Sequence, residues 1–217
     1  MLIYYFINKN GFSNCYIIAN ERTKETIIID PSDITEDIIN TLESNSFHLS
    51  SVLVTHNHKT HIQGIKILTK IYSPKIFGAD WEIEGKRTIF LAGEGKIKTA
   101  GLTVHYMLVS GHSSDSMIYK IGNALFIGDV FSAGKIGSTN SSYSKYELCT
   151  NITQKILSQQ DNTIMFPGHG PPTTVESEKQ FNYIAEAHSD KKDLYLKPNN
   201  EGGGTVTNSN KKNEKPT

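Results

Sequence analysis

The sequence predicts a layered α/β protein in which sheets pack on one another and helices lie outside them. Short apolar and β-branched runs fill the first thirty residues and recur between residues 102 and 127. Segments with helical spacing of apolar residues follow each of these β-rich regions. Several neighbouring strands are separated only by short polar turns, which join antiparallel strands. A doubly wound parallel sheet is therefore excluded.

The first part of the chain contains predicted strands that alternate with two predicted helices. Residues 33–42 carry isoleucine and leucine at helical spacing, with Ser32 or Asp33 as the expected N-cap. From His61 to Ile71 apolar residues recur every third position, which predicts one helix with a single buried face. The predicted strands are Leu2–Ile7, Asn14–Ala19, 25–30 and 51–55.

The second part repeats the pattern after a less regular stretch. Residues 75–101 carry a short strand near Ile76 and a turn-rich segment at 93–95. The domain is expected to span residues 1–190. Residues 197–217 contain Asn, Gly, Lys and Thr with little to bury, so they are expected to be a disordered tail. The strands predicted here are 102–109, 116–121, 124–127 and 163–166, and the helices are 145–158 and about 174–188.

Composition narrows the functional classes. The chain of 217 residues has 22 basic and 22 acidic side chains, which argues against a nucleic-acid or membrane-surface partner and leaves a small-molecule substrate as the expected one. The N-terminus lacks the basic and long apolar segments of a signal peptide. Cys15 and Cys149 lie far apart without CxxC spacing, so both are expected to be free thiols in a reducing, cytoplasmic setting.

Histidines gather at the ends of predicted strands. His56, His58 and His61 follow the strand at 51–55 within six residues. His112, Asp129 and His169 stand in similar contexts after later strands. Imidazole nitrogen and carboxylate oxygen are ligands that zinc prefers, and loops at strand ends can converge on one edge of a sheet. The sequence therefore predicts a metal site. No role is assigned to His48, His105 or His188.

These motifs together resemble the metallo-β-lactamase superfamily, in particular its small glyoxalase II-like hydrolases. The family pattern HxHxDH followed by separate His, Asp and His motifs appears here as THNHKTH, GHSSDSMIY, LFIGDVFSAGKIG and FPGHGPPTT. Ile29-Asp30-Pro31 also looks like the family's strand-end turn. The resemblance covers roughly residues 1–188 and implies a four-layer αββα sandwich with the site at the edge between two sheets.

The resemblance also implies which residues bind metal. A first metal would be held by His56, His58 and His112, and a second by His61 and His169. Asp129 would bridge the two. The cofactor would be one or two zinc ions, and a metal-bound hydroxide, rather than a side chain, would attack a carbonyl carbon.

Three positions depart from the family pattern. Thr60 stands where the family has the Asp that would bind the second metal, so the second half of the site loses a charge. Gly137-Ser138-Thr139-Asn140 replaces the family's GRxD, which removes an Arg and an Asp together. Gly170 stands where glyoxalase II carries an acidic residue, and its long C-terminal glutathione-binding domain has no counterpart. The sequence thus predicts an asymmetric site, with one metal firmly bound and the second weakly bound.

Three functions are compatible with this pattern. The first is a metal-dependent hydrolase of a small thioester or ester. The second is a mononuclear iron enzyme of the persulfide dioxygenase type, on His56, His112 and Asp129, in which the absence of a carboxylate at Thr60 matters less. The third is a degenerate member with little turnover, which Thr60, Ser138 and Asn140 motivate.

Overall fold

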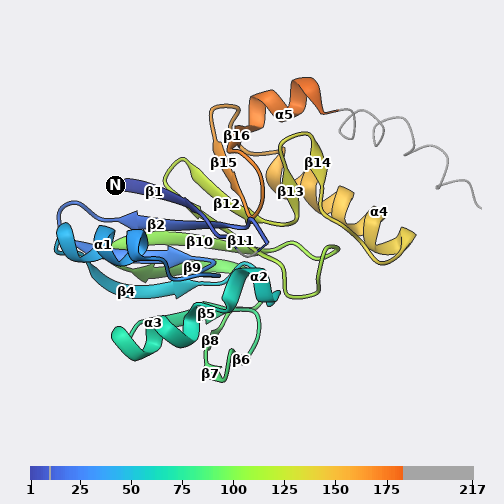
Figure 1. The fold of residues 1–217 in the computed structure, drawn as a ribbon. Helices are drawn as coiled ribbons and strands as arrows, with labels where there is room; N and C mark the ends of the chain where they lie inside the picture. Colours follow the sequence, from blue (N-terminus) through green and yellow to red (C-terminus); the bar gives the residue numbers. More distant parts are fainter. Residues whose placement is uncertain (10, 183–217) are drawn as a thin grey trace, which may run out of the picture.

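Two six-stranded sheets form the centre of the computed structural model, which describes residues 1–9 and 11–182 (Figure 1). The first sheet has the order β1 (Leu2–Ile7), β2 (Asn14–Ala19), β3 (Glu25–Ile29), β4 (His48–Leu53), β5 (Lys75–Gly78) and β8 (Ile89–Phe90). The second has the order β16 (Thr173–Thr174), β15 (Ile164–Pro167), β12 (Ala124–Gly128), β11 (Met117–Ile121), β10 (Leu102–Leu108) and β9 (Glu94–Thr99). Two small hairpins pair β6 (Glu82–Ile83) with β7 (Lys86–Arg87), and β13 (Phe131–Ser132) with β14 (Lys135–Ile136).

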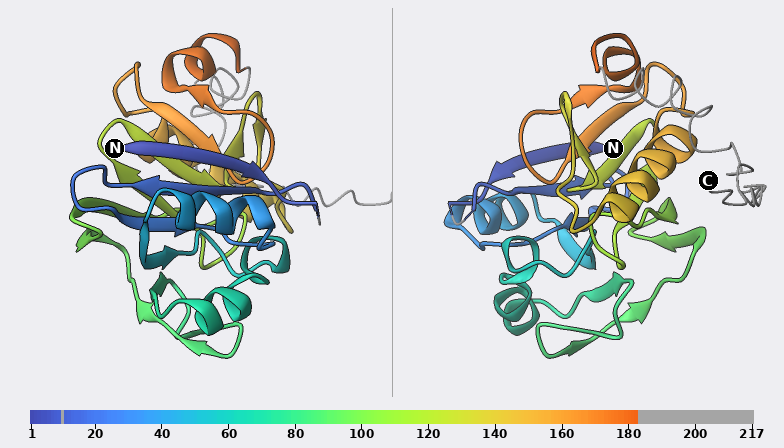
Figure 2. Two further views of the ribbon diagram at one scale, coloured as in Figure 1. Left: turned by 60° about the vertical axis from the view of Figure 1, so that its left-hand side comes forward. Right: turned by 90° about the vertical axis from the view of Figure 1, so that its right-hand side faces the viewer.

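Helices cover the outer face of each sheet. The first sheet carries α1 (Glu36–Ser44), α2 (Lys59–Ile62) and α3 (Ile65–Ile71), whose buried apolar residues share one hydrophobic cluster with residues of β2 and β4. The second sheet is covered by α4 (Ser142–Asn151) and its π-helical continuation Ile152–Ile156. The first residue of α5 (Val175–Phe181) packs in the same cluster. A third cluster lies between the sheets. Figure 2 shows the sheets between α1 and α3 on one side and α4 on the other, so the predicted αββα sandwich is confirmed.

The period of two along the central strands explains why two sheets can pack here. Along β2, Cys15 and Ile17 enter the cluster under the helices, whereas Tyr16 and Ile18 enter the cluster between the sheets. β12 divides in the same way, because Phe126 faces the first sheet and its neighbours in sequence face α4. Strands that are apolar on both faces can lie only in a middle layer.

Parallel pairing brings functional loops to one edge. β3, β4, β5 and β8 run parallel in the first sheet, as do β12 and β15 in the second. The loops after β4, β12 and β15 therefore leave the sheets at their carboxyl ends. The backbone N–H of Met117 in the second sheet donates to the carbonyl of Thr55 after the first sheet's β4, at 2.7 Å. This bond fixes the two sheets to each other beside the histidine loops.

The single helix predicted from His61 onward is wrong in part, because it is broken into α2 and α3. The break lies at Gly64, whose N–H donates to the carbonyl of Pro31 at 2.9 Å. A Cβ at Gly64 would lie 2.7 Å from that same oxygen, so only glycine allows this approach. Ile71, predicted to be buried, is 54% exposed.

Other boundaries also differ from the prediction. Thr35, rather than Ser32 or Asp33, caps α1 by accepting from the N–H of Ile38. The strand β9 was not predicted, and only its first two residues fall in the turn-rich segment predicted at 93–95. Its charged residues alternate along an exposed edge and form no apolar run. The helix predicted at 145–158 begins three residues earlier, after the cap Ser141, and ends in the π-helical turn.

The structure describes the C-terminal part of the chain only as far as residue 182. The helix predicted for about 174–188 is observed as α5 to Phe181, and its remainder lies outside the described residues, as do the predicted tail 197–217 and His188. Cys15 and Cys149 are free, as predicted, and the structure also shows both to be buried. Among the described residues no helix is long and apolar enough to cross a membrane.

The doubly buried middle layer predicts where truncation is costly. Ile28 in β3 is fully buried, whereas Ile67 in α3 is 46% exposed. Replacing Ile28 by Ala should lower the free energy of unfolding by about 2–5 kcal/mol, because a cavity remains in a close-packed layer. The matched change Ile67→Ala should alter it by less than about 0.5 kcal/mol. Urea denaturation measures both, and equal effects would contradict the layer assignment.

Candidate metal centre

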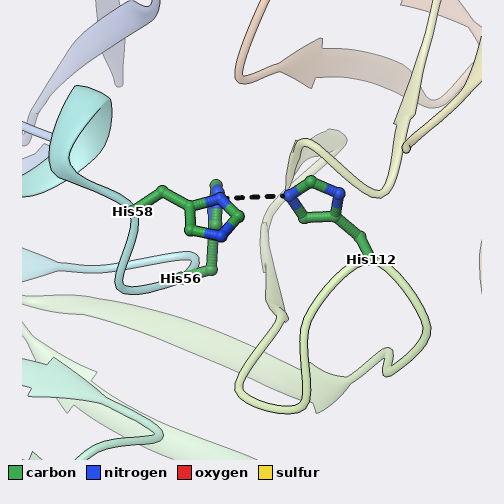
Figure 3. Close-up of side chains that lie close together, drawn as sticks. All are labelled: His56, His58 and His112. Carbon is green, nitrogen blue, oxygen red and sulfur yellow. Dashed lines mark hydrogen bonds between the residues drawn. The ribbon is translucent and has the colours of Figure 1, made fainter. Parts of the chain in front are cut away.

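Three histidines from two different loops face one point. His56 and His58 follow β4, and His112 lies in the loop between β10 and β11 (Figure 3). One ring nitrogen of each lies within 4.8 Å of the others. Nδ1 of His58 and Nε2 of His112 are 3.3 Å apart. Nitrogen atoms at these distances can share one zinc ion, since zinc–nitrogen bonds are about 2.0–2.1 Å long.

His56 supplies a direct test of whether a metal fits. Its side chain is 1% exposed, and its Nε2 has no hydrogen-bond partner among the described residues. A buried polar atom without a partner is costly, so native proteins rarely keep one. A metal ion between the three rings would supply that partner. The site therefore fits the metal that the sequence predicts.

Asp129 and His61 form a second group beside the first. Nε2 of His61 lies 3.3 Å from Oδ2 of Asp129, and Nε2 of His56 lies 3.7 Å from the same oxygen. Ligand atoms of these three residues also lie within 4.8 Å of one another. Asp129 comes directly after β12, so the second sheet places a carboxylate between the histidines of the first. The predicted role of Asp129 as a bridging ligand stays a prediction.

His169 joins the site through Asp129. Its Nδ1 lies 2.7 Å from Oδ1 of Asp129, and its Nε2 lies 3.1 Å from the carbonyl oxygen of Gly11. Both partners are acceptors, so the ring donates to them in this arrangement. Its predicted role as a metal ligand stays a prediction, and would require the ring to turn away from Gly11.

Asp30 holds the rings of two histidines in place from behind. Its Oδ1 accepts from the N–H of Thr55 at 2.8 Å, and its Oδ2 accepts from the Thr55 hydroxyl at 2.6 Å. Nδ1 of His61 donates to the same Oδ2 at 3.1 Å. Because the Thr55 hydroxyl gives its only proton to Asp30, it must accept from Nδ1 of His56 at 3.0 Å. Both rings therefore carry a proton on Nδ1, so Nε2 is the atom through which each ring could bind a metal.

A backbone carbonyl orients the ring of His112 in the same way. Nδ1 of His112 donates to the carbonyl oxygen of Ser138 at 2.9 Å, which leaves its Nε2 free. Ser138 and Asn140 themselves are exposed. The position that carries Arg in the family therefore contributes its backbone here, and a pocket of about 160 Å³ opens beside it. The pocket is lined by His112, Asp129, Ser132, Gly137, Ser138 and His169.

Two glycines let the loops approach this closely. A Cβ at Gly168 would overlap the carboxylate of Asp129 and lie 2.8 Å from the ring of His61. A Cβ at Gly137 would overlap the backbone carbonyl of Asp129. Any larger residue would push the carboxylate away from the histidines.

Charge is unevenly distributed over the site. Burial, and then the neighbouring His61, lower the pKa of His56 to about 3, so its ring is neutral and can bind metal. Burial opposes the charge on His61, but hydrogen bonds to Asp129 and Asp30 outweigh it and raise its pKa to about 10. Burial likewise opposes the charge on Asp129, yet bonds from His169 and His61 hold its pKa well below the usual range. The carboxylates of Asp30 and Asp129 thus place negative charge at this point, which a bound metal ion would balance.

Thr60 brings no carboxylate into this arrangement. It lies in α2, partly buried, and its backbone carbonyl accepts a hydrogen bond from Ser13. A Cβ at Gly11 would lie 2.5 Å from its methyl group. The half of the site built on His61 therefore has one charged ligand fewer than the family pattern.

Sequence reasoning missed the residues that tie the histidine loops together. The backbone N–H of Asn57 donates to Oδ2 of Asp115, and its side-chain amide donates to Oδ2 of Asp80, both at 2.7 Å. The side chain of Asn14 donates to the carbonyls of Pro167 and Gly170, which flank His169. Asn57 stands inside the histidine motif, but no sequence pattern reveals its distant partners. His48 and His105 are exposed, in β4 and β10.

Comparison with known sequences finds relatives among metallo-hydrolases, although no family model matches. The chain is 26% identical over 198 residues to the probable polyketide biosynthesis zinc-dependent hydrolase PksB of Bacillus subtilis, covering 86% of this chain and 87% of that protein. It is 27% identical over 157 residues to the hydroxyacylglutathione hydrolase of Chromohalobacter salexigens, covering 71% of this chain but only 60% of that enzyme.

Comparison with solved structures gives matches over most of the chain. The BLEG-1 B3 metallo-β-lactamase superposes with a TM-score of 0.74 at 25% identity, covering 83% of this chain and 98% of the other. ETHE1 from Myxococcus xanthus superposes with a TM-score of 0.75 at 21% identity, covering 91% and 92%.

The role of Asp30 can be tested without touching a metal ligand. Asp30→Asn keeps the size of the side chain but removes the charge that orients His56 and His61. We expect metal affinity to fall roughly 10–100-fold. Competition with a chromophoric zinc chelator measures this, with the exposed Asp37→Asn as the matched control. Unchanged affinity in a folded Asp30→Asn protein would show that the ring orientations do not depend on Asp30.

Proposed function

The chain has the metallo-β-lactamase fold, and from this premise we propose that it is a metal-dependent hydrolase of a small thioester or ester. At the level of the superfamily its relatives support a metallo-hydrolase, since one is a probable zinc-dependent hydrolase and another a hydroxyacylglutathione hydrolase. The thioester or ester substrate, and zinc as the metal, are the finer parts of the proposal. Iron is the alternative metal.

The observation that carries the proposal is the buried, unpartnered Nε2 of His56 among converging ring nitrogens. Structural metal sites surround the ion completely, whereas catalytic sites keep one position open. Here the three histidines of the first group lie next to an open pocket whose wall includes His112 and Asp129. A small substrate can therefore reach the point where the metal would lie.

The protein's own residues perform definite tasks around that point. His56, His58 and His112 would hold the first metal, which would lower the pKa of a bound water and polarise the substrate carbonyl. Asp129 is ionised and places a negative charge at the edge of the pocket. His169 is held by Asp129 and Gly11 and lines the same pocket. Asp30 and Ser138 keep the ligand rings oriented throughout.

The pocket also bears on the type of substrate. Its described lining outside the metal centre consists of Ser132, Gly137 and Ser138, which carry no charge. The chain matches only 60% of the hydroxyacylglutathione hydrolase, so that enzyme's own substrate is not carried over to it. A short, uncharged acyl group fits the space better.

Two other functions remain as alternatives because of Thr60. A mononuclear iron enzyme would need only His56, His112 and Asp129, none of which Thr60 disturbs. A degenerate member would bind metal without appreciable turnover. The identity of the metal in protein from cells grown without added zinc distinguishes the iron enzyme from the proposed hydrolase. Turnover of a thioester distinguishes the degenerate member from it.

Removing a histidine of the first group tests the proposed function. His56→Ala or His112→Ala should reduce bound zinc and the hydrolysis of a simple acetyl thioester to background, because each removes a ligand of the firmly bound metal. Elemental analysis and a thiol-release assay measure the two effects. The exposed His105→Ala is the control and should match the unsubstituted protein. A His56→Ala protein that keeps its metal would refute the assignment.

Restoring the missing carboxylate tests the predicted asymmetry. Thr60→Asp should raise the bound zinc from about one to about two ions per chain and increase the hydrolysis rate, because a charged ligand joins the half built on His61. Thr60→Asn introduces a side chain with the shape of Asp but without its charge, so it should change neither the bound zinc nor the hydrolysis rate. If the unsubstituted protein already binds two ions and turns over rapidly, the asymmetric site and the degenerate alternative are both wrong.

A further inference from the structure

The edge strand β1 is the least protected edge in the two sheets. The edges formed by β8 and β16 are only two residues long. The edge strand β9 carries Glu94, Lys96 and Lys98 along its length, and such charges discourage pairing with another strand. β1 has six residues with the sequence LIYYFI, without a charge, glycine or proline.

Backbone groups along the outer side of β1 lack partners within the described residues. Asn8 donates its N–H to Ser13 across the β1–β2 hairpin. Because hydrogen-bonded pairs alternate in an antiparallel ladder, Phe6, Tyr4 and Leu2 also turn their backbone groups toward β2. Ile3, Tyr5 and Ile7 therefore turn their N–H and C=O groups outward. No other described strand pairs with that side (Figure 1).

Side chains of the same three residues form an apolar border. Ile3 packs against the cluster between the sheets, and Tyr5 stacks on Tyr16 of that cluster with ring centroids 5.5 Å apart. Tyr5 is 40% exposed and Ile7 is 57% exposed. Ile164 in β15 is another exposed apolar residue, 42% accessible. The cluster between the sheets thus reaches solvent at this edge.

We propose that β1 is a dimer interface, where it pairs antiparallel with β1 of a second copy of this chain. The pattern is self-complementary: with Tyr5 on the twofold axis, Tyr5 faces its own copy and Ile3 faces Ile7. All outward backbone groups are then paired, and the two first sheets become one continuous sheet. No charged residue of β1 opposes this approach, and a symmetric pairing closes after two chains, which leaves no further edge of this kind.

A lysine on the edge tests the interface. Sedimentation velocity at micromolar concentrations should give twice the protomer mass of 24.1 kDa for the unsubstituted chain. Ile7→Lys should raise the dimer dissociation constant about tenfold or more, because it places a charge against Ile3 of the other copy. The matched control is Ile71→Lys on α3, where the native side chain is 54% exposed, and it should remain a dimer. Monomeric unsubstituted protein, or equal effects of both lysines, would overturn the proposal.

A crosslink tests the register independently of dimer strength. Cα atoms of a hydrogen-bonded antiparallel pair are about 5.5 Å apart, which lies within disulfide range. Tyr5→Cys should therefore form a disulfide-linked dimer on mild oxidation, whereas Ile71→Cys should remain monomeric in a denaturing gel. Cys15 and Cys149 are buried and contribute little background. No faster crosslinking of Tyr5→Cys than of Ile71→Cys would contradict the proposed axis, whatever the outcome for catalysis.

Discussion

The carboxylate of Asp30 is the interaction on which the metal centre depends most. It lies 2% exposed after β3, with a positive φ of 51°, and accepts from the backbone and hydroxyl of Thr55 and from His61. A buried carboxylate is stable only with several donors, and here the donors are the loop that carries the histidines. The same bonds that satisfy Asp30 therefore orient His56 and His61. Fold stability and ligand geometry have one cause at this point.

The second sheet contributes to the site in a different way. Asp129, His112 and His169 reach the histidines of the first sheet only because the sheets pack face to face, and because Gly137 and Gly168 leave room for the loops. The cluster between the sheets, with Tyr16 and Phe126 at its centre, holds this distance constant. The hydroxyl of Tyr16 donates to the carbonyl of Pro167, two residues before His169, and so links the core to the site directly.

Much of this could be predicted from the sequence, for identifiable reasons. β2 and β12 are apolar runs that the sequence marks as strands, and the order of β-rich and helical regions predicts sheets packed on one another. The histidine motif after β4 marks the site because several imidazoles in a few residues need a common partner. The sequence could not show that Ser138 acts through its carbonyl, or that Asn57 binds Asp80 and Asp115, since these contacts depend on tertiary structure. β9 and the break at Gly64 were missed because a charged edge strand and a close backbone approach have no periodic signal.

The central claim is that the two halves of the site differ, with His56, His58 and His112 binding the firmer metal. Anomalous diffraction from crystals grown with a single equivalent of zinc would locate that ion directly. We expect one zinc peak, bonded to Nε2 of His56, Nδ1 of His58 and Nε2 of His112. A peak bonded to His61 and Asp129 alone, or equal occupancy of both halves, would contradict it.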